Sequence, residues 1–256
     1  MGTPLKDWDI NINYGIKTGY NDAFIITTDK RNEILDNCET EDERKRTEEL
    51  IRPLLRGRDI KRYGYEWAGL WLINSHNGIK DRLHRIDIEE YPAVKAHLDL
   101  YLKQLEKRTD KGDTPYNLRK CAYLEDFFVP KIVFKEIVQS SQFFYDDSTH
   151  YLCNDTCRII VGGNLPFLLG IFNSRLFFYA VKKFYGGGVL GEKGIRMKHT
   201  FFGNFPCLPL IEEVGRIAQE LCNHFSEELA NQLDNAIYSA YALTEEEIKE
   251  IQREAI

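Results

Sequence analysis

The sequence predicts an α/β protein in which a mixed-sheet domain (residues 1–210) is followed by a C-terminal helical arm (residues 211–256). In the first part, short runs of β-branched and aromatic residues alternate with stretches of helical periodicity. Hydrophobic residues make up 43% of the 256 residues, which is enough for a packed core. Beyond Leu210, apolar residues recur at steps of three and four, as on one face of a helix.

The first segment, ININYGIKTGYNDAFII, has a turn between two apolar stretches. Trp8, Ile10 and Ile12 alternate with polar residues, which predicts a strand. Residues 23–28 predict a second strand, so we expect a hairpin or a strand–loop–strand unit. The turn Gly15–Gly19 can bind a phosphate through backbone amides and Lys17, or it can be a purely structural turn.

Several later segments carry clear start signals. Thr40 and Glu43 form a capping-box pattern, which predicts a helix over residues 41–50. GLWLI (69–73) predicts a short buried strand, and Pro92 is placed to begin a helix. We expect further strands at residues 131–138, 143–145 and 158–161, and helices after Asn164 and Ser174.

The C-terminal part, residues 211–256, has the pattern of helices alone. Apolar residues from Val214 to Ile237 predict one long amphipathic helix, on the order of 40 Å at 1.5 Å per residue. Thr244 with Glu247 predicts a cap for a short final helix. No run of eighteen apolar residues and no signal peptide is seen, so we expect a soluble, cytoplasmic protein without a membrane partner. Six scattered cysteines fit reduced thiols.

The charge is unevenly distributed along the chain. The total is −6, but residues 211–256 hold eleven acids and three bases, a charge of −8, which leaves +2 on residues 1–210. Residues 51–62 and residues 182–199 each carry a local charge of +4. Such clusters can be solvated surfaces or binding sites for phosphates, and two of them beside an acidic tail favour phosphate binding.

Catalytic motifs are weak in this sequence. The glycine-rich stretch GGGVLGEKGIR (186–196) lacks the Gly-Lys-Ser/Thr ending of a P-loop, and DTPY (113–116) is one residue away from an amino-methyltransferase motif. Asp59-Ile60-Lys61 matches the acid-x-lysine pair of metal-dependent nucleases, but no second acid can be assigned to it. A pairing of Asp59 with Arg56 or Arg58 is the simpler interpretation.

Five motifs together point to a known family: YGIKTGYNDAF (14–24), LIRPLLRGRDIKRY (50–63), PKIVFKE (130–136), FLLGIFNSRL (167–176) and LDNAIYSAYALTEEEI (233–248). In order and spacing they resemble the C-terminal target-recognition domain of type IIG restriction–modification enzymes and of related phage-defence N6-adenine DNA methyltransferases. The resemblance covers nearly the whole chain.

The resemblance implies a sequence-specific double-stranded DNA recognition module that is not itself catalytic. It also implies partner domains, a methyltransferase and a nuclease of the same or another chain, which would bind S-adenosylmethionine and Mg²⁺. The helical arm would pack the module against such a partner. No cofactor or metal is expected in this chain.

The candidate DNA contacts come from the turn, the two basic clusters and the strand at 131–138. Arginines can clamp phosphates or bind guanine edges bidentately, and Lys135 with Glu136 are candidate base readers. The predicted contact residues are Lys17, Thr18, Arg56, Arg58, Lys61, Arg62, Lys135, Lys193, Arg196 and Lys198.

Two other functions remain open. One is a metal-dependent nuclease that uses Asp59 and Lys61, and the other is a protein-interaction module that docks through the helix at 211–241. The DNA-binding interpretation requires residues 17, 56–62 and 193–198 to lie on one side of the molecule.

Overall fold

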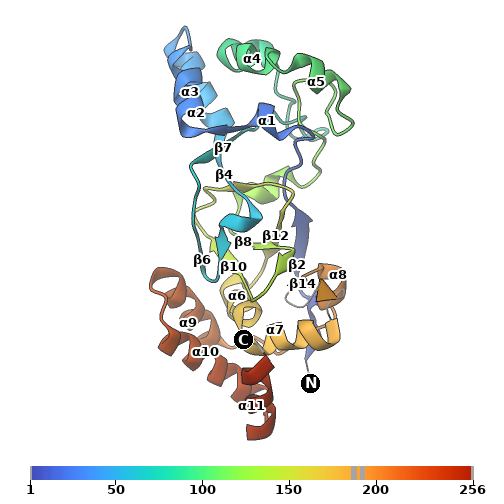
Figure 1. Ribbon diagram of the computed structural model, residues 1–256, viewed down its shortest axis with the longest axis vertical. Coiled ribbons are helices and arrows are strands. Elements are labelled where there is room, and N and C mark those ends of the chain that lie inside the picture. Colours follow the sequence, from blue (N-terminus) through green and yellow to red (C-terminus); the bar gives the residue numbers. More distant parts are fainter. Residues whose placement is uncertain (1, 186–188, 191–193, 255–256) are drawn as a thin grey trace.

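The molecule is elongated, with a β-sheet across its middle and helices at both ends (Figure 1). The computed structural model describes residues 2–185, 189–190 and 194–254. Lys193 therefore lies outside the described residues. In the orientation of Figure 1, the sheet separates an upper lobe, which holds α1 to α5, from a lower lobe, which holds α6 to α11.

The central sheet is antiparallel and has the order β10-β8-β12-β2. Ile132 and Phe134 on β8 lie in the lower hydrophobic core, whereas Val133 between them lies in the upper core. Because successive side chains of a strand point to opposite faces, a strand that is covered on both sides is apolar throughout. The four strands are β2 (Ile10–Tyr14), β8 (Lys131–Lys135), β10 (Phe143–Asp146) and β12 (Cys157–Gly162).

The upper lobe contains a mixed sheet in the order β11-β4-β7-β3, in which β11 runs parallel to β4 and the other pairs are antiparallel. Its strands are β3 (Ile25–Thr27), β4 (Ile51–Leu55), β7 (Leu70–Ile73) and β11 (Leu152–Cys153). Its helices are α1 (Asn21–Phe24), α2 (Thr28–Asp36), α3 (Glu41–Leu50), α4 (Pro92–Asp99) and α5 (Leu102–Lys107), with 3-10 turns η3 (Ile88–Glu90) and η4 (Leu124–Phe128).

The lower lobe is helical, and its core is one hydrophobic cluster that runs from Leu5 to Ile251. Helix α9 packs along α6, where Gly170 allows Val214 to approach the helix backbone. The helices are α6 (Leu165–Asn173), α7 (Arg175–Ala180), the π-helical turn η5 (Val181–Tyr185), α8 (His199–Phe202), α9 (Glu212–Asn223), α10 (Glu227–Ala240) and α11 (Glu245–Glu254).

Short strand pairs complete the fold. They are β1 (Thr3–Pro4) with β15 (Pro206–Cys207), β5 (Ile60–Lys61) with β6 (Gly64–Tyr65), and β14 (Gly194–Arg196) between β9 (Ile137–Val138) and β13 (Val189–Leu190). Two 3-10 turns, η1 (Leu5–Asp7) and η2 (Gly57–Asp59), precede β2 and β5.

The predicted fold class, an α/β protein with C-terminal helices, is confirmed, and so are the helices with clear caps. Thr40 accepts a hydrogen bond from the Glu43 amide at 3.1 Å at the start of α3. Ser174 accepts one from the Phe177 amide at 3.1 Å at the start of α7. These caps supply acceptors for amides that have no partner inside the helix.

Of the two arrangements expected for the opening stretch, the hairpin is wrong, whereas two successive strands without mutual pairing are observed, with the short helix α1 between them. Strand β2 pairs with β12 in the central sheet, and β3 pairs with β7 in the upper sheet. The Thr18 hydroxyl accepts from the Tyr20 amide at 3.2 Å and donates to Asn21 Oδ1 at 2.6 Å. This local side-chain turn begins the short helix α1, so the chain leaves the first sheet instead of folding back.

The predicted single long helix is also wrong, because α9 and α10 are separate helices that pack together. Ser226 accepts from the Leu229 amide at 3.2 Å and begins α10, with Glu227 and Glu228 in its first turn. A serine cap followed by acids is a strong start signal that overrides the continuous apolar periodicity. The domain boundary near Leu210 stays a prediction.

Gly15 is the position where the fold leaves least room. A Cβ at Gly15 would lie 1.8 Å from the Asn154 carbonyl oxygen, whereas a Cβ at Gly163 would meet no atom within 4 Å. We expect Gly15→Ala to lower the free energy of unfolding by about 2–3 kcal/mol and Gly163→Ala to change it by less than about 0.5 kcal/mol. Urea denaturation measures both. Equal values for the two variants would contradict the close approach.

Candidate nucleic-acid interface

Segments from distant parts of the sequence meet at the turn between β11 and β12. Ile16 forms a parallel bridge with Asn154, and the Asn154 amide donates to the Leu55 carbonyl oxygen at 3.1 Å. The Gly57 amide donates to the Thr156 hydroxyl at 2.8 Å. Residues 14–17 and the first basic cluster (residues 51–62) therefore both contact the turn at residues 154–156, which we call the crossing turn.

The end of β8 adjoins this crossing turn. A Cβ at Gly57 would lie 3.1 Å from the Lys135 Cβ, so η2 and β8 are in close contact. Burial lowers the pKa of Lys135, and the nearby positive charge of Lys61 lowers it further. Lys61 and Lys135 are therefore close enough for their charges to interact, and both add to the positive potential beside Arg58.

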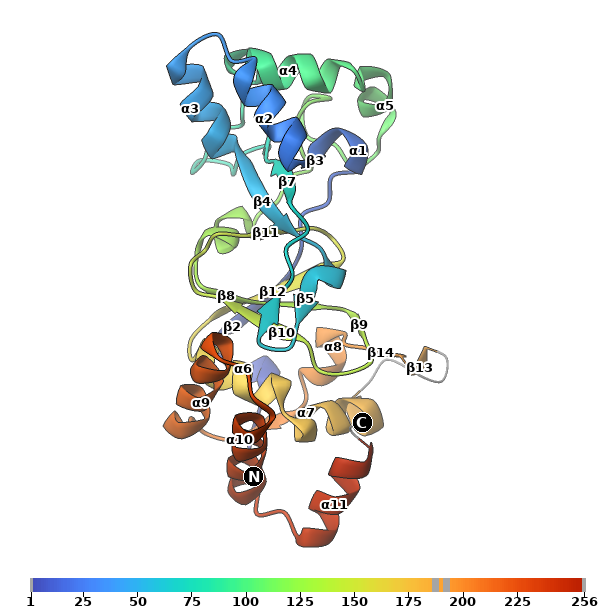
Figure 2. The same cartoon turned by 60° about the vertical axis from the view of Figure 1, so that its left-hand side comes forward.

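The second basic cluster reaches the same region through Glu136. The Glu136 carbonyl oxygen accepts from the Met197 amide at 2.6 Å, and its carboxylate pairs with Arg158 and, at 3.6 Å, with Arg196. Strands β9 and β14 lie side by side next to the central sheet (Figure 2). The described parts of the predicted basic segments thus lie on elements that contact one another through the crossing turn and Glu136. That their side chains share one side of the molecule stays a prediction.

Four of the predicted contact residues present charge to solvent. Within the described part of the chain, the exposed Arg58 has no hydrogen-bond or ion-pair partner. Lys17 pairs with Asp110 at 2.6 Å and Lys61 with Glu66 at 3.0 Å, and both lysine side chains are almost half exposed. Arg196 is partly exposed, with 42% of its side chain accessible.

Two further predicted lysines are only partly exposed. The Lys198 ammonium lies over the ring of Phe201, at 5.6 Å from its centroid. Lys135 is half-buried on β8. Both can extend their ammonium groups from the surface while their aliphatic stems stay packed.

The side chains of three predicted DNA-contact residues make hydrogen bonds within the protein instead. The Arg56 guanidinium makes a bidentate contact with Asp59, at 2.9 and 3.0 Å, and Asp59 is buried. Arg62 donates to the Asn173 carbonyl oxygen at 3.0 and 3.2 Å, at the junction of α6 and α7. Thr18 is 2% exposed, and its hydroxyl serves the turn before α1. Charge clustering in the sequence does not reveal which arginine points inward.

Sequence reasoning missed a groove of about 600 Å³ beside the crossing turn. Arg119 and Lys120 were adjacent bases in the sequence and could have been singled out. Tyr14 and Arg158 could not, because their contact depends on the pairing of β2 with β12. The residues that line the groove are Tyr14, Gly15, Ile16, Lys17, Arg119, Lys120, Cys121, Ala122, Tyr123, Asp155 and Arg158.

A buried arginine ties the turn Gly15–Gly19 to one wall of this groove. Arg108 donates to the carbonyl oxygens of Thr18, of Pro115 at 2.8 Å and of Asn117 at 2.5 Å. Burial lowers the pKa of Arg108 to about 10, so the group stays charged at neutral pH. A single charged side chain thereby satisfies carbonyl groups from two loops.

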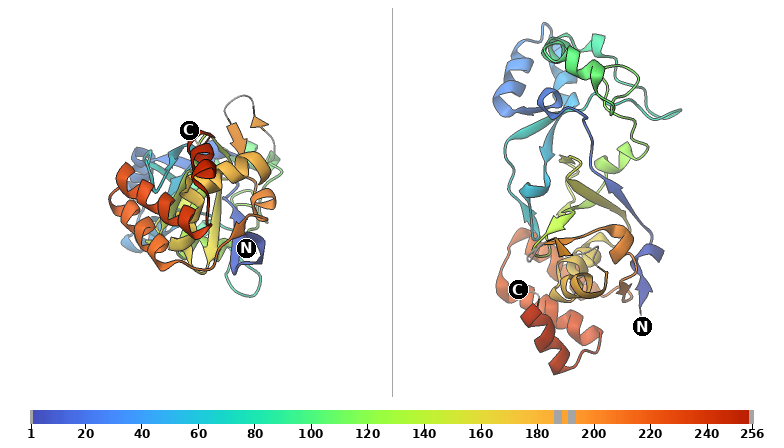
Figure 3. Two further views of the ribbon diagram at one scale, coloured as in Figure 1. Left: turned by 90° about the horizontal axis from the view of Figure 1, so that it is seen from below. Right: turned by 45° about the vertical axis from the view of Figure 1, so that its right-hand side comes forward.

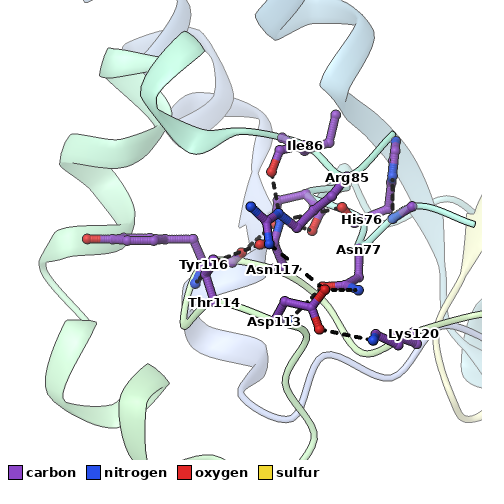
Figure 4. Close-up of polar contacts among 11 residues, drawn as sticks. His76, Asn77, Arg85, Ile86, Asp113, Thr114, Tyr116, Asn117 and Lys120 are labelled. Atoms are coloured by element: carbon purple, nitrogen blue, oxygen red, sulfur yellow. Dashed lines mark hydrogen bonds and ion pairs between the residues drawn. The ribbon is translucent and has the colours of Figure 1, made fainter. Parts of the chain in front are cut away.

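The segment DTPY is a structural turn (Figure 4). Thr114 donates to Asn117 Oδ1 at 2.6 Å, and the Asn117 amide group donates to the Ile86 carbonyl oxygen at 2.9 Å. Asp113 accepts from Asn77 at 3.2 Å and pairs with Lys120 at 3.0 Å. These contacts connect the turn to the loop after β7 and hold Lys120 at the groove.

The acid-x-lysine pair does not form a metal site in this structure. Both carboxylate oxygens of Asp59 accept hydrogen bonds from Arg56, and Lys61 pairs with Glu66. Across the residues that are described, no group of three His, Cys, Asp or Glu side chains is placed to hold a metal ion. None of the helices formed by the described residues is long and apolar enough to cross a membrane.

The fold and the basic surface define a two-lobed α/β recognition module. The chain belongs to the family of TaqI-like C-terminal specificity domains, whose sequence model matches residues 52–190. The resemblance that the motifs indicated is therefore confirmed. No curated protein matches the chain in sequence.

Two solved structures share the fold. The type IIL restriction-modification enzyme MmeI in complex with DNA has a TM-score of 0.67 and 16% identity, over 94% of this chain and 34% of that chain. The type IIG restriction endonuclease BpuSI has a TM-score of 0.52 and 18% identity, over 88% of this chain and 26% of that chain. This chain thus spans about a third and a quarter of their lengths.

The contact between Arg56 and Asp59 generates a stability prediction. Asp59→Asn removes the charge that a half-buried arginine pairs with, and we expect the free energy of unfolding to fall by about 3 kcal/mol. Asp7→Asn, at an exposed aspartate without such a partner, should change it by less than about 0.5 kcal/mol. Urea denaturation of both variants is the measurement, and an Asp59→Asn protein as stable as the parent would show that the pair is not structural.

His199 provides a second prediction. Burial lowers its pKa, and the charges of Arg158 and Lys198 add to this effect, while Glu136 opposes it. Because the folded state binds the proton less well than the unfolded state, the contribution of His199 to stability is present above pH 6.5 and is lost as the pH falls below that value. We expect an NMR titration to give a pKa below 6.5 for His199.

The variant Lys198→Gln should raise the His199 pKa toward 6.5, since it removes a nearby positive charge. Lys45→Gln, on the remote helix α3, should leave it unchanged. If Lys198→Gln has no effect, Lys198 does not face His199 in solution.

Proposed function

We propose that this chain is the sequence-specific double-stranded DNA recognition module of a restriction–modification or phage-defence adenine methyltransferase. In this proposal the chain performs no catalysis. Methyltransferase and nuclease domains, in the same or a partner chain, bind S-adenosylmethionine and Mg²⁺. The system acts in the cytoplasm, where its DNA is found.

The observation that carries this proposal is that the first two basic segments contact the crossing turn and the third contacts Glu136 at the end of the adjoining strand β8. DNA carries one negative charge per about 1.7 Å of its axis, so a protein that binds it needs several cations along one surface. Lys17, Arg58, Lys61, Arg196 and Lys198 lie on elements that adjoin one another around the crossing turn and Glu136. Membership of a specificity-domain family and the shared fold of MmeI, which was solved in complex with DNA, support the same function.

The environment of each cation suggests its role. Arg58 and Lys17 are exposed, and Lys61 and Lys198 are partly exposed, which suits contacts with phosphates that fix the position of the module. The Arg196 guanidinium lies 3.6 Å from the Glu136 carboxylate. We propose Arg196 as the residue that binds a guanine edge, because the guanidinium fork can make that contact bidentately.

The two alternative functions are less well supported. A nuclease would need a carboxylate that is free to bind metal, and Arg56 occupies both oxygens of Asp59. An interaction module would need an unburied apolar face on the 211–241 segment. Val214, Ile217 and Leu221 of α9 are buried in the lower core instead. The acidic surface of α9–α11 repels DNA, and we propose that it faces the partner domain.

The salt dependence of DNA binding tests the proposal. Each phosphate contact contributes about −0.9 to the slope of log K against log [salt] for duplex DNA. We expect Arg58→Ala and Lys61→Ala each to flatten the slope by about 1 for a mixed-sequence duplex, as measured by fluorescence anisotropy. Lys45→Ala, which removes the same charge from α3 on the upper lobe, should leave the slope unchanged.

Two results would contradict the proposed interface. If the parent chain binds duplex DNA with no dependence on salt, phosphate contacts do not drive binding. If Lys45→Ala flattens the slope as much as Arg58→Ala does, the effect comes from net charge and not from the surface around the crossing turn.

A further inference from the structure

The groove beside the crossing turn combines two kinds of wall. Lys17, Arg119 and Lys120 carry positive charge, with 48%, 59% and 71% of their side chains exposed. Tyr14 is an aromatic wall, and the residue is 48% exposed. The volume of about 600 Å³ is in the range of small-molecule sites.

The cations of the groove are held in place by acids. Lys17 pairs with Asp110 at 2.6 Å, and Arg119 pairs with the other oxygen of the same carboxylate at 3.3 Å. These two bases lower the pKa of Asp110, so it stays ionised. The donors of Lys17 and Arg119 are thus kept within reach of one anion, and Lys120 is steadied nearby by Asp113.

Tyr14 is supported as a stacking surface. The Arg158 guanidinium covers one face of its ring, 3.8 Å from the centroid. His199 meets the same ring edge-on, at 6.3 Å between centroids. Arg158 is itself fixed by Glu136 and by the Cys157 carbonyl oxygen, at 3.1 Å. An aromatic ring that is held in this way, and still half exposed, is suited to stacking with a planar group.

We propose that this groove binds one nucleotide unit, with its phosphate against Lys17, Arg119 and Lys120 and its base stacked on Tyr14. Stacking requires an exposed base face, so a nucleotide of DNA would have to be turned out of the base stack to occupy it. In that form the inference rests on the proposed function. A free mononucleotide presents the same chemistry, and the experiment below distinguishes the two sources.

A second aromatic hollow among the described residues lacks this combination. It has a volume of about 650 Å³ and lies between the β5–β6 hairpin and α9. Tyr65, Tyr145 and Tyr151 line it, but no lysine or arginine is among its described lining residues, so it has no cation for a phosphate. The groove beside the crossing turn is therefore the better site for a nucleotide.

The test is an NMR titration of the ¹⁵N-labelled chain with deoxyadenosine 5′-monophosphate, deoxyadenosine and inorganic phosphate. We expect saturable shifts at the amides of residues 15–17 and 119–123. The nucleotide should bind at least tenfold more tightly than either fragment, because it uses both walls at once. Equal affinity for nucleotide and phosphate, or shifts scattered over the surface, would overturn the inference.

Three variants separate the two walls. Tyr14→Phe keeps the ring and should retain nucleotide binding, whereas Tyr14→Leu keeps the bulk without the ring and should weaken it at least fivefold. Arg119→Ala should weaken the binding of both the nucleotide and inorganic phosphate. Lys45→Ala is the control for charge. If Tyr14→Leu, folded as judged by its spectrum, binds the nucleotide as tightly as Tyr14→Phe does, the stacking surface is not used.

Duplex DNA is then added as a competitor to distinguish the sources. If DNA displaces the mononucleotide, the groove takes a nucleotide of the DNA. If the chain binds mononucleotide but no DNA, the groove is a site for a free nucleotide and the proposed function fails on its own. If the chain binds duplex DNA and shows no nucleotide binding at millimolar concentration, this inference fails and the proposed function stands.

Discussion

The close approach of Gly15 to Asn154 is the constraint on which the basic surface depends. Asn154 receives the backbone of Ile16 on one side and donates to Leu55 on the other, so two remote segments are fixed on one short turn. The turn is itself rigid, because the Asn154 side chain accepts from both the amide and the hydroxyl of Thr156. That hydroxyl also accepts from the Gly57 amide. A side chain at position 15 would clash with the Asn154 carbonyl oxygen and would displace Ile16 and Lys17 from the crossing turn.

The turn can hold this position because the sheet beneath it is anchored to both lobes. Strands β8 and β12 carry side chains into both cores, so neither lobe can shift without disturbing the other. The right-hand view of Figure 3 shows the sheet between the two lobes. Lys131 and Asp146 form a fully buried ion pair at 2.7 Å within this sheet. Buried charges are costly unless every polar atom is satisfied. Asp146 also accepts from Ser148 and from the Tyr151 amide, which connects β10 to the strand leading into the crossing turn.

The features that the sequence predicted correctly are those that depend on residues close together in the chain. Helix starts at Thr40, Ser174 and Thr244 depend on residues three or four positions apart, and these predictions are confirmed. The pairing of β2 is not local, since its partner β12 lies more than 140 residues later, and the expected hairpin was wrong. The same distinction holds for the site. Clusters of charge were visible, but the inward direction of Arg56 and Arg62 depends on Asp59 and on the distant Asn173. The Tyr14–Arg158 contact requires the register of β2 and β12, which only the fold supplies.

The acids behind the exposed cations explain how a chain with a charge of −6 could recognise DNA selectively. Asp110, Asp113 and Glu136 each sit beside one or two basic side chains. They reduce the long-range attraction for any phosphate backbone, which is the source of non-specific binding. They also hold the cations in defined orientations, which increases the advantage of a ligand whose groups match those positions. A surface of this kind binds weakly to DNA in general and depends on geometry for its affinity. In the proposed function a partner domain would hold the duplex against this surface, and of the acidic helices α11 lies at the lower end of the molecule, away from the central sheet (Figure 1).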